Sequence, residues 1–147
     1  PFGPLKLEGW ENTCQVELRE DSILFITTGT GSWWGGALSY ASGKSQNLSS
    51  FKKGRLVLSI RGNSNCNFEL GLQSGSYAKG NLQEGGFKFG PSSTHQISPQ
   101  WQTFSLDFSV LEGSLNWEDI GALLYLKGLD KFNGGTLELK NISLQRT

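Results

Sequence analysis

The chain has 147 residues, the size of one domain, and its 13 basic and 13 acidic residues give a formal net charge of zero. This balance argues against a nucleic-acid partner, because phosphate binding needs a basic field that the chain lacks overall. The composition is rich in glycine, with 20, and in large aromatic residues, with 5 Trp and 9 Phe. Such a composition favours many short strands joined by tight turns. No apolar run is long enough to cross a membrane.

The N-terminal residues 1–4 read as the remnant of a linker, so we expect a single module over residues 1–147 that was excised or processed from a longer protein. The two cysteines, Cys14 and Cys66, are too few for a disulfide framework and have no neighbouring His or Cys for a zinc site. They either pair with each other or stay as small buried hydrophobes.

The first strands are predicted from short alternating segments. Residues 5–7 open a strand that ends at 8–10, and residues 14–19 and 23–28 alternate apolar and polar side chains around a turn at Asp21-Ser22. The second and third segments therefore form a hairpin. A glycine-containing loop at 28–31 then leads into the next strand.

A tryptophan doublet stands in that next strand, residues 31–40, with the sequence GSWWGGALSY. Neighbouring side chains of a strand point to opposite faces, so one indole of Trp33 and Trp34 should enter the core and the other should face solvent. The alternative is that both rings pack. An exposed indole is a flat apolar plate with a polar edge, a shape that stacks on the apolar face of a sugar ring.

The clearest alternation lies in residues 47–62 and continues in residues 68–73. It turns Leu and Ile side chains inward and places Arg61, Glu69 and Gln73 on one solvent-facing side of neighbouring strands. These polar side chains either bond sugar hydroxyls or, in the case of Arg61 and Glu69, form only a cross-strand ion pair.

Residues 74–100 are rich in Gly, Ser, Asn and Pro and are expected to form a long irregular surface loop that carries Tyr77, a candidate binding residue. Strands follow at residues 101–108, 120–128 and 136–145. In the second of these, Tyr125 should point outward from between core leucines. The remaining tryptophans, Trp10, Trp101 and Trp117, are expected to be structural. The spacing of about 8 to 12 residues between strands predicts an all-β antiparallel sandwich.

The order of five segments resembles that of a known group of proteins. A Trp-Gly-Gly strand, NLSSFKKGRLVLSIRG, FELGLQSG, WQTFSLDF and GGTLELKNISL are similar to the galactose-binding-like jelly rolls of non-catalytic carbohydrate-binding modules. The pattern resembles the C-terminal domain of ExoP-type β-glucan exohydrolases and, more loosely, the family 4, 11 and 30 modules.

This resemblance implies a jelly-roll β-sandwich of two antiparallel sheets that holds polysaccharide, most simply a β-glucan, on one sheet face. The positions that match are Trp33 or Trp34, Arg61, Glu69, Gln73 and Tyr125. Many such modules also bind a structural calcium at an Asp-Asn-Ile motif in the last strand. Here the motif reads Lys140-Asn141-Ile142, which argues against that site, so we expect no metal or other cofactor.

The same resemblance implies an attached glycoside hydrolase as partner, a secreted or cell-surface location and no catalysis. From the charge balance and the lack of a long apolar run we expect neither a nucleic-acid nor a membrane partner. Two other interpretations stay open. A non-catalytic docking domain would pack this face against a catalytic partner. A small glycan-active enzyme would need two carboxylates across a cleft, for which Glu69 and Asp107 are the candidates.

Overall fold

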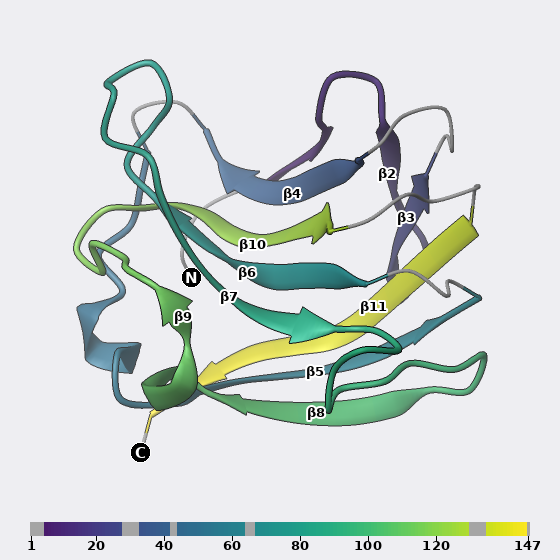
Figure 1. Ribbon diagram of the computed structural model, residues 1–147. Coiled ribbons are helices and arrows are strands. Elements are labelled where there is room, and N and C mark those ends of the chain that lie inside the picture. The colour runs from purple at the N-terminus through teal and green to yellow at the C-terminus, as the bar shows by residue number, and fades with distance from the viewer. Residues whose placement is uncertain (1–4, 28–32, 42–43, 64–66, 130–134, 147) are drawn as a thin grey trace.

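The computed structural model describes residues 5–27, 33–41, 44–63, 67–129 and 135–146 (Figure 1). These residues form strands and two single 3-10 turns, at Ser49–Phe51 and Phe108–Val110. The strands are β1 (Leu5–Gly9), β2 (Cys14–Leu18), β3 (Ile23–Thr27), β4 (Gly35–Tyr40), β5 (Arg55–Gly62), β6 (Phe68–Ser74), β7 (Gln83–Phe89), β8 (Gln102–Asp107), β9 (Glu112–Gly113), β10 (Ile120–Gly128) and β11 (Gly135–Gln145). Within the described part of the chain, no helix is long and apolar enough to span a membrane.

The strands form two antiparallel sheets that pack face to face, as the sequence predicted (Figure 1). The six-stranded sheet has the order β1-β4-β10-β6-β7-β9, and the five-stranded sheet has the order β2-β3-β11-β5-β8. The predicted hairpin of β2 and β3 is confirmed, with Cys14 opposite Thr27. Strands that follow each other in sequence often lie in different sheets, which is the pattern of a β-sandwich rather than a simple meander.

The core lies between the two sheets and follows the alternation read from the sequence. β5 contributes Leu56, Leu58 and Ile60, all fully buried, and β6 contributes inward side chains in the same way. Because alternate residues of each strand face the core, the polar residues between them are presented on the outer faces of the sandwich.

Two expectations about this middle region are wrong. Residues 74–100 are not one loop, because β7 lies within them and pairs with β6 along seven residues. Arg61 and Glu69 do not share a face either: β5 pairs with β11 and β8, whereas β6 pairs with β10 and β7. Arg61 instead bonds Glu138 of β11, with its Nε 2.9 Å from the carboxylate oxygen Oε1.

A bulge in β10 affects which side chains of this strand point to the outer face of the six-stranded sheet. The pairing of β10 with both neighbours shifts register between Ala122 and Tyr125. An extra residue of this kind changes which side chains point outward. Ala122, Tyr125 and Ala37 consequently form a small buried cluster separate from the main core, with Trp10 packed against it.

Cys14, at the start of β2, is a buried free thiol. Burial raises its pKa to about 12, partly offset by a backbone hydrogen bond. Cys66 lies outside the described residues, as do residues 1–4, which the sequence assigned to a linker.

Candidate functional site

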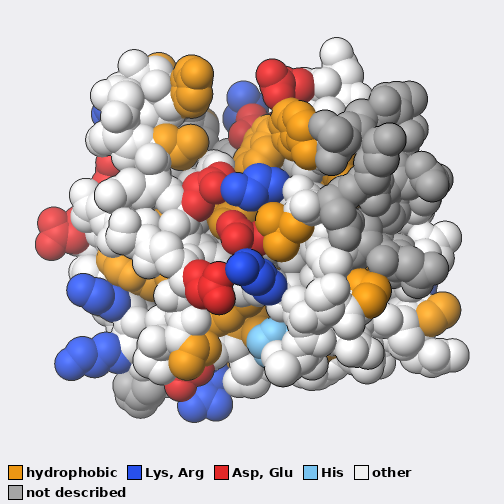
Figure 2. All heavy atoms as spheres, viewed as in Figure 1, with side chains coloured by type: hydrophobic (Ala, Val, Ile, Leu, Met, Phe, Trp, Pro, Cys, Tyr) orange, Lys and Arg blue, Asp and Glu red, His pale blue; other side chains and the backbone are white. Residues whose placement is uncertain are grey.

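A cleft of about 1090 Å³ lies on the outer face of the six-stranded sheet. Side chains of β1 and the adjoining turn line one side, the connection between β6 and β7 lines the other, and outward residues of β4, β6 and β10 lie between them. In Figure 2 the cleft is a hollow between two lobes that both carry hydrophobic side chains, with acidic and basic side chains gathered near its base. A volume of this size is typical of ligand sites.

Four aromatic residues line the cleft, Trp10, Trp33, Tyr40 and Tyr77, and of these Tyr40 is buried. Trp33 is 36% exposed and Tyr77 is 89% exposed, so both rings are accessible from solvent. Trp10 was expected to be structural. It is partly buried against Tyr125, yet it also lines the cleft, and nothing in its local sequence distinguished it from the other structural tryptophans.

Trp34 does not belong to this surface. Its side chain is 2% exposed and packs with Phe68 in the core, their ring centroids 6.1 Å apart. The ring also approaches Gly128 so closely that a Cβ there would collide with the indole. The two rings therefore differ in exposure as predicted, but they precede β4, which begins at Gly35, instead of lying within a strand over residues 31–40. Trp34, named as a candidate binding residue, is excluded from direct stacking by its burial.

Tyr125 is also buried, against the prediction that it points into solvent. Its exposed fraction is 0%, because the indole of Trp10 covers it with ring centroids 6.0 Å apart and planes inclined by 28°. The hydroxyl donates a hydrogen bond to the carboxylate of Glu69. Burial, followed by the hydrogen bond to and the charge of Glu69, raises the pKa of Tyr125 far above its usual range. Tyr125 therefore stays protonated and remains a hydrogen-bond donor.

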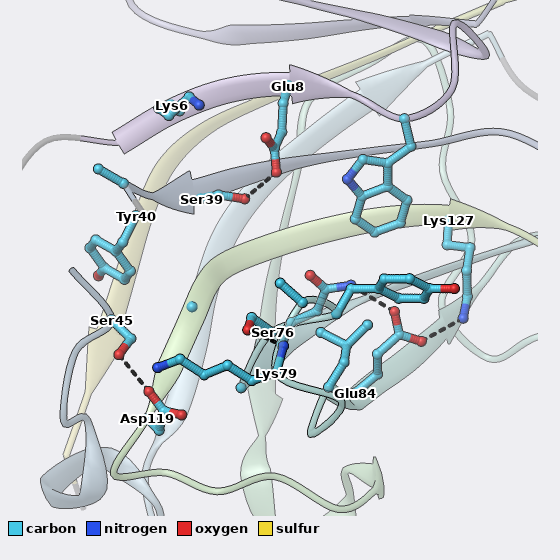
Figure 3. A pocket seen from close by; sticks show the side chains of 18 of the residues that line it. Lys6, Glu8, Ser39, Tyr40, Ser45, Ser76, Lys79, Glu84, Asp119 and Lys127 are labelled. Atoms are coloured by element: carbon cyan, nitrogen blue, oxygen red, sulfur yellow. Dashed lines mark hydrogen bonds and ion pairs between the residues drawn. The ribbon is translucent and has the colours of Figure 1, made fainter. Parts of the chain in front are cut away.

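A network of polar side chains connects three strands at one end of the cleft. Glu84 of β7 accepts hydrogen bonds from Gln73 of β6, at 2.8 Å, and from Lys127 of β10, at 2.7 Å (Figure 3). Lys127 also lies 4.0 Å from Glu69. Because the amide nitrogen of Gln73 bonds Glu84, its carbonyl oxygen is the end that can accept from a ligand hydroxyl. The predicted residues Glu69 and Gln73 are thus linked through Lys127 and Glu84, and of the two only Gln73 lines the cleft.

The other end of the cleft is polar as well. Ser39 of β4 donates to Glu8 of β1 at 2.7 Å, and Ser45 donates to Asp119 (Figure 3). Lysine side chains from β1 and from the β6–β7 connection also line the cleft. Both acidic and basic side chains line the cleft, so it does not present a field of one sign.

The β6–β7 connection is held in shape by its own hydrogen bonds. Gly75 and Gly80 both have φ near +69°, a left-handed conformation that glycine adopts readily. Asn81, directly after Gly80, accepts at its side-chain oxygen from the backbone N–H of Ser76 at 2.9 Å and donates its own backbone N–H to the carbonyl of Ser76 at 3.3 Å. These bonds fix the loop that carries Tyr77, so this aromatic ring is presented by a defined backbone.

Arg61 lies away from the cleft, on the outer face of the five-stranded sheet. Its guanidinium is 4.6 Å from the ring centroid of Trp101, and Lys140 lies over the same ring at 4.2 Å. Hydrogen bonds from Ser22 and Arg61 lower the pKa of Glu138, the Ser22 bond being the larger cause. Arg61 is therefore not placed with the other predicted site residues.

The structure also bears on the enzyme and metal interpretations. Glu69 lies on the six-stranded sheet and Asp107 on the five-stranded sheet, so these two carboxylates do not face each other across the cleft. Among the described residues, no cluster of three or more His, Cys, Asp or Glu side chains could hold a metal ion. The chemistry of the cleft is that of aromatic surfaces and hydrogen-bonding groups.

The comparisons with known proteins agree on one fold. A family 30 carbohydrate-binding module superposes with a TM-score of 0.70 at 16% identity, covering 96% of this chain and 78% of that chain. A family 30 module of a cellulosomal cellulase of Clostridium thermocellum gives 0.68 at 16% identity, covering 96% and 89%. A family 11 module from the same organism, in complex with a β-1,3-1,4-mixed-linked tetrasaccharide, gives 0.58 at 15% identity, covering 94% and 86%.

Two sequence comparisons gave different results. No curated protein matches this sequence. The family described as Carbohydrate binding domain 30, however, matches residues 9–146, nearly the whole chain. The chain therefore belongs to the family 30 carbohydrate-binding modules, and it binds carbohydrate without catalysing a reaction.

Proposed function

We propose that the cleft on the six-stranded sheet binds a β-glucan chain. The observation that carries this proposal is the position of Trp33 and Tyr77, two exposed aromatic rings that line one cleft together with hydrogen-bonding side chains. A pyranose ring has an apolar face and a rim of hydroxyls, and such a cleft offers both an aromatic surface and polar partners.

The charges in the cleft favour an uncharged polymer. Lys127 is already paired with Glu84, and the lining residues include both acidic and basic side chains. An acidic polysaccharide would need a positive field, which this mixture does not supply. Hydroxyl groups, in contrast, can both donate to the carboxylates and accept from the lysines.

The choice of a β-glucan is supported by the named ligands and sources of similar structures. The family 11 module was solved with a mixed-linkage β-glucan tetrasaccharide, and one family 30 module comes from a cellulase. At 15–16% identity these structures establish the fold of this chain, so its own glucan specificity remains our proposal.

In this proposal the module is joined to a glycoside hydrolase and is secreted or displayed at the cell surface. Binding the polymer would raise the effective concentration of the attached enzyme at its substrate without any new catalytic contact. Single stacked rings contribute modestly, so we expect weak to moderate affinity that increases with oligosaccharide length.

Affinity electrophoresis tests the proposal directly. Gels would contain mixed-linkage β-glucan, β-1,3-glucan, xyloglucan, mannan or galactan. We expect retardation by a β-glucan that weakens in Trp33→Ala and Tyr77→Ala but not in Trp101→Ala, a matched control on the other sheet. Retardation by mannan or galactan alone would overturn the glucan assignment. Migration unchanged by every polysaccharide would instead favour the alternative of a docking domain.

A further inference from the structure

We propose that Tyr125 is a positioning residue for the cleft. Its buried ring supports the indole of Trp10, which lines the cleft, and its hydroxyl holds the carboxylate of Glu69 near Lys127, which also lines the cleft. This inference rests on the proposed function of the cleft. It gives Tyr125 a role in binding although the residue itself is out of reach of a ligand.

The indole of Trp10 is held by two neighbouring residues. Tyr125 packs against its ring, and Gly35 of the neighbouring strand approaches so closely that a Cβ at that position would collide with the indole. The backbone N–H of Trp10 also donates to the carbonyl of Gly35 at 2.9 Å, and the hydroxyl of Thr13 donates to the carbonyl of Trp10 at 2.7 Å. Removing the Tyr125 ring would remove the one aromatic ring on which the indole stacks among the described residues.

The carboxylate of Glu69 is fixed by the same tyrosine. A Cβ at Gly86 would lie 2.6 Å from Cγ of Glu69 and 2.8 Å from the hydroxyl oxygen of Tyr125, so the space for this pair exists only because residue 86 is glycine. Lys127 lies 4.0 Å from the Glu69 oxygen that accepts the Tyr125 hydroxyl. Without the hydroxyl, Glu69 would be free to turn towards Lys127 and disturb the bond between Lys127 and Glu84.

The location of Tyr125 indicates that it serves the cleft rather than the sandwich core. It belongs to a small cluster with Ala37 and Ala122 on the outer face, which is separate from the main core and is closed by Trp10. Two small alanine side chains beside one tyrosine leave most of the volume of this cluster to the tyrosine ring. Its burial is therefore a consequence of Trp10 lying over it.

Two substitutions separate the two contacts. Tyr125→Phe keeps the ring and removes the donor to Glu69, and Tyr125→Leu removes the ring as well. Ser22→Ala is the matched control, because it removes another hydroxyl that donates to a carboxylate, that of Glu138 on the other sheet. Affinity for mixed-linkage β-glucan oligosaccharides would be measured by calorimetry, and stability by urea denaturation.

We expect Tyr125→Phe to weaken binding roughly three- to tenfold, the range set by loss of one charge-assisted hydrogen bond that acts indirectly. Tyr125→Leu should weaken binding further. In the ligand-free protein, Tyr125→Leu should shift the indole N–H resonance of Trp10 from its wild-type position. In Tyr125→Phe, which keeps the ring, this resonance should stay at its wild-type position. Ser22→Ala should lower stability with no change in affinity.

Two results would overturn the inference: wild-type affinity in a folded Tyr125→Phe variant, or an equal loss of affinity in Ser22→Ala, which would indicate a general effect of stability. The resonance of Trp10 requires no ligand. If the wild-type protein bound no glycan, the proposed function would fail. The support of Trp10 by Tyr125 would then be tested by the resonance alone, and an unshifted Trp10 resonance in Tyr125→Leu would refute it.

Discussion

The two adjacent tryptophans are expected to respond in opposite ways to the same substitution. Trp34 is 2% exposed and packed against Phe68, whereas Trp33 is 36% exposed and lines the cleft. Trp34→Ala should therefore reduce stability, and Trp33→Ala should reduce affinity. Because the two residues are neighbours, any loss of stability or affinity that comes only from changing this segment should occur in both variants. Each variant is therefore a control for the other.

The magnitudes follow from burial. A buried tryptophan removes about 150–250 Å² from water, equivalent to roughly 4–6 kcal/mol at about 25 cal/mol per Å². Measured losses for truncating buried aromatic residues are about 3–5 kcal/mol, which is a large part of the stability of a typical domain. For Trp33→Ala, loss of one aromatic contact of about 0.5–1.5 kcal/mol corresponds to roughly a two- to twelvefold weaker affinity.

Urea denaturation and calorimetric titration with a mixed-linkage β-glucan oligosaccharide measure the two effects separately. The expected result is a large fall in the denaturation midpoint for Trp34→Ala and only a small one for Trp33→Ala. A Trp34→Ala variant with wild-type stability, or a Trp33→Ala variant with wild-type affinity and a severe loss of stability, would refute the division of roles.

Three further predictions concern the stability of the protein and the reactivity of its thiol. Tyr40→Phe should leave stability unchanged or raise it by up to about 1 kcal/mol in urea denaturation, because the buried hydroxyl of Tyr40 has no hydrogen-bond partner among the described residues. The pKa of Glu138 is lowered in the folded state, chiefly by Ser22, so its contribution to stability is present above the ordinary carboxyl range and is lost as the pH falls. Glu138→Gln should therefore be less stable than the wild type near neutral pH, with the two denaturation curves converging in acid. Cys14, buried with a pKa raised to about 12, should resist alkylation at pH 8 until the protein unfolds, as mass spectrometry of its peptide would show.

The sequence was most informative where strand alternation decides the outcome. The inward leucines of β5 need only the period of two and are confirmed. The predicted difference in exposure between Trp33 and Trp34 is also confirmed, although the two residues lie just before β4 and not within it. Arg61 shows the limit of this reasoning. Alternation placed it correctly on an outer face, but it could not reveal that β5 and β6 enter different sheets, because pairing depends on long-range packing.

The burial of Tyr125 and the existence of β7 were missed for related reasons. Glycine weakens strand preference, so the Gly85-Gly86 pair made residues 83–89 read as a loop. In the structure Gly86 gives space to Tyr125 and Glu69, a contact between strands that no local pattern indicates. Similarly, Trp10 covers Tyr125 only after β1 has paired with β4 in the same sheet.

The central claim is that carbohydrate binds the cleft of the six-stranded sheet, and the indole N–H resonances of the tryptophans test it most directly. Titration of the labelled protein with a mixed-linkage β-glucan oligosaccharide should shift the signals of Trp10 and Trp33, which line the cleft, and leave that of Trp101 on the other sheet unchanged. Saturable shifts of Trp101 with Trp10 and Trp33 unmoved would contradict the account.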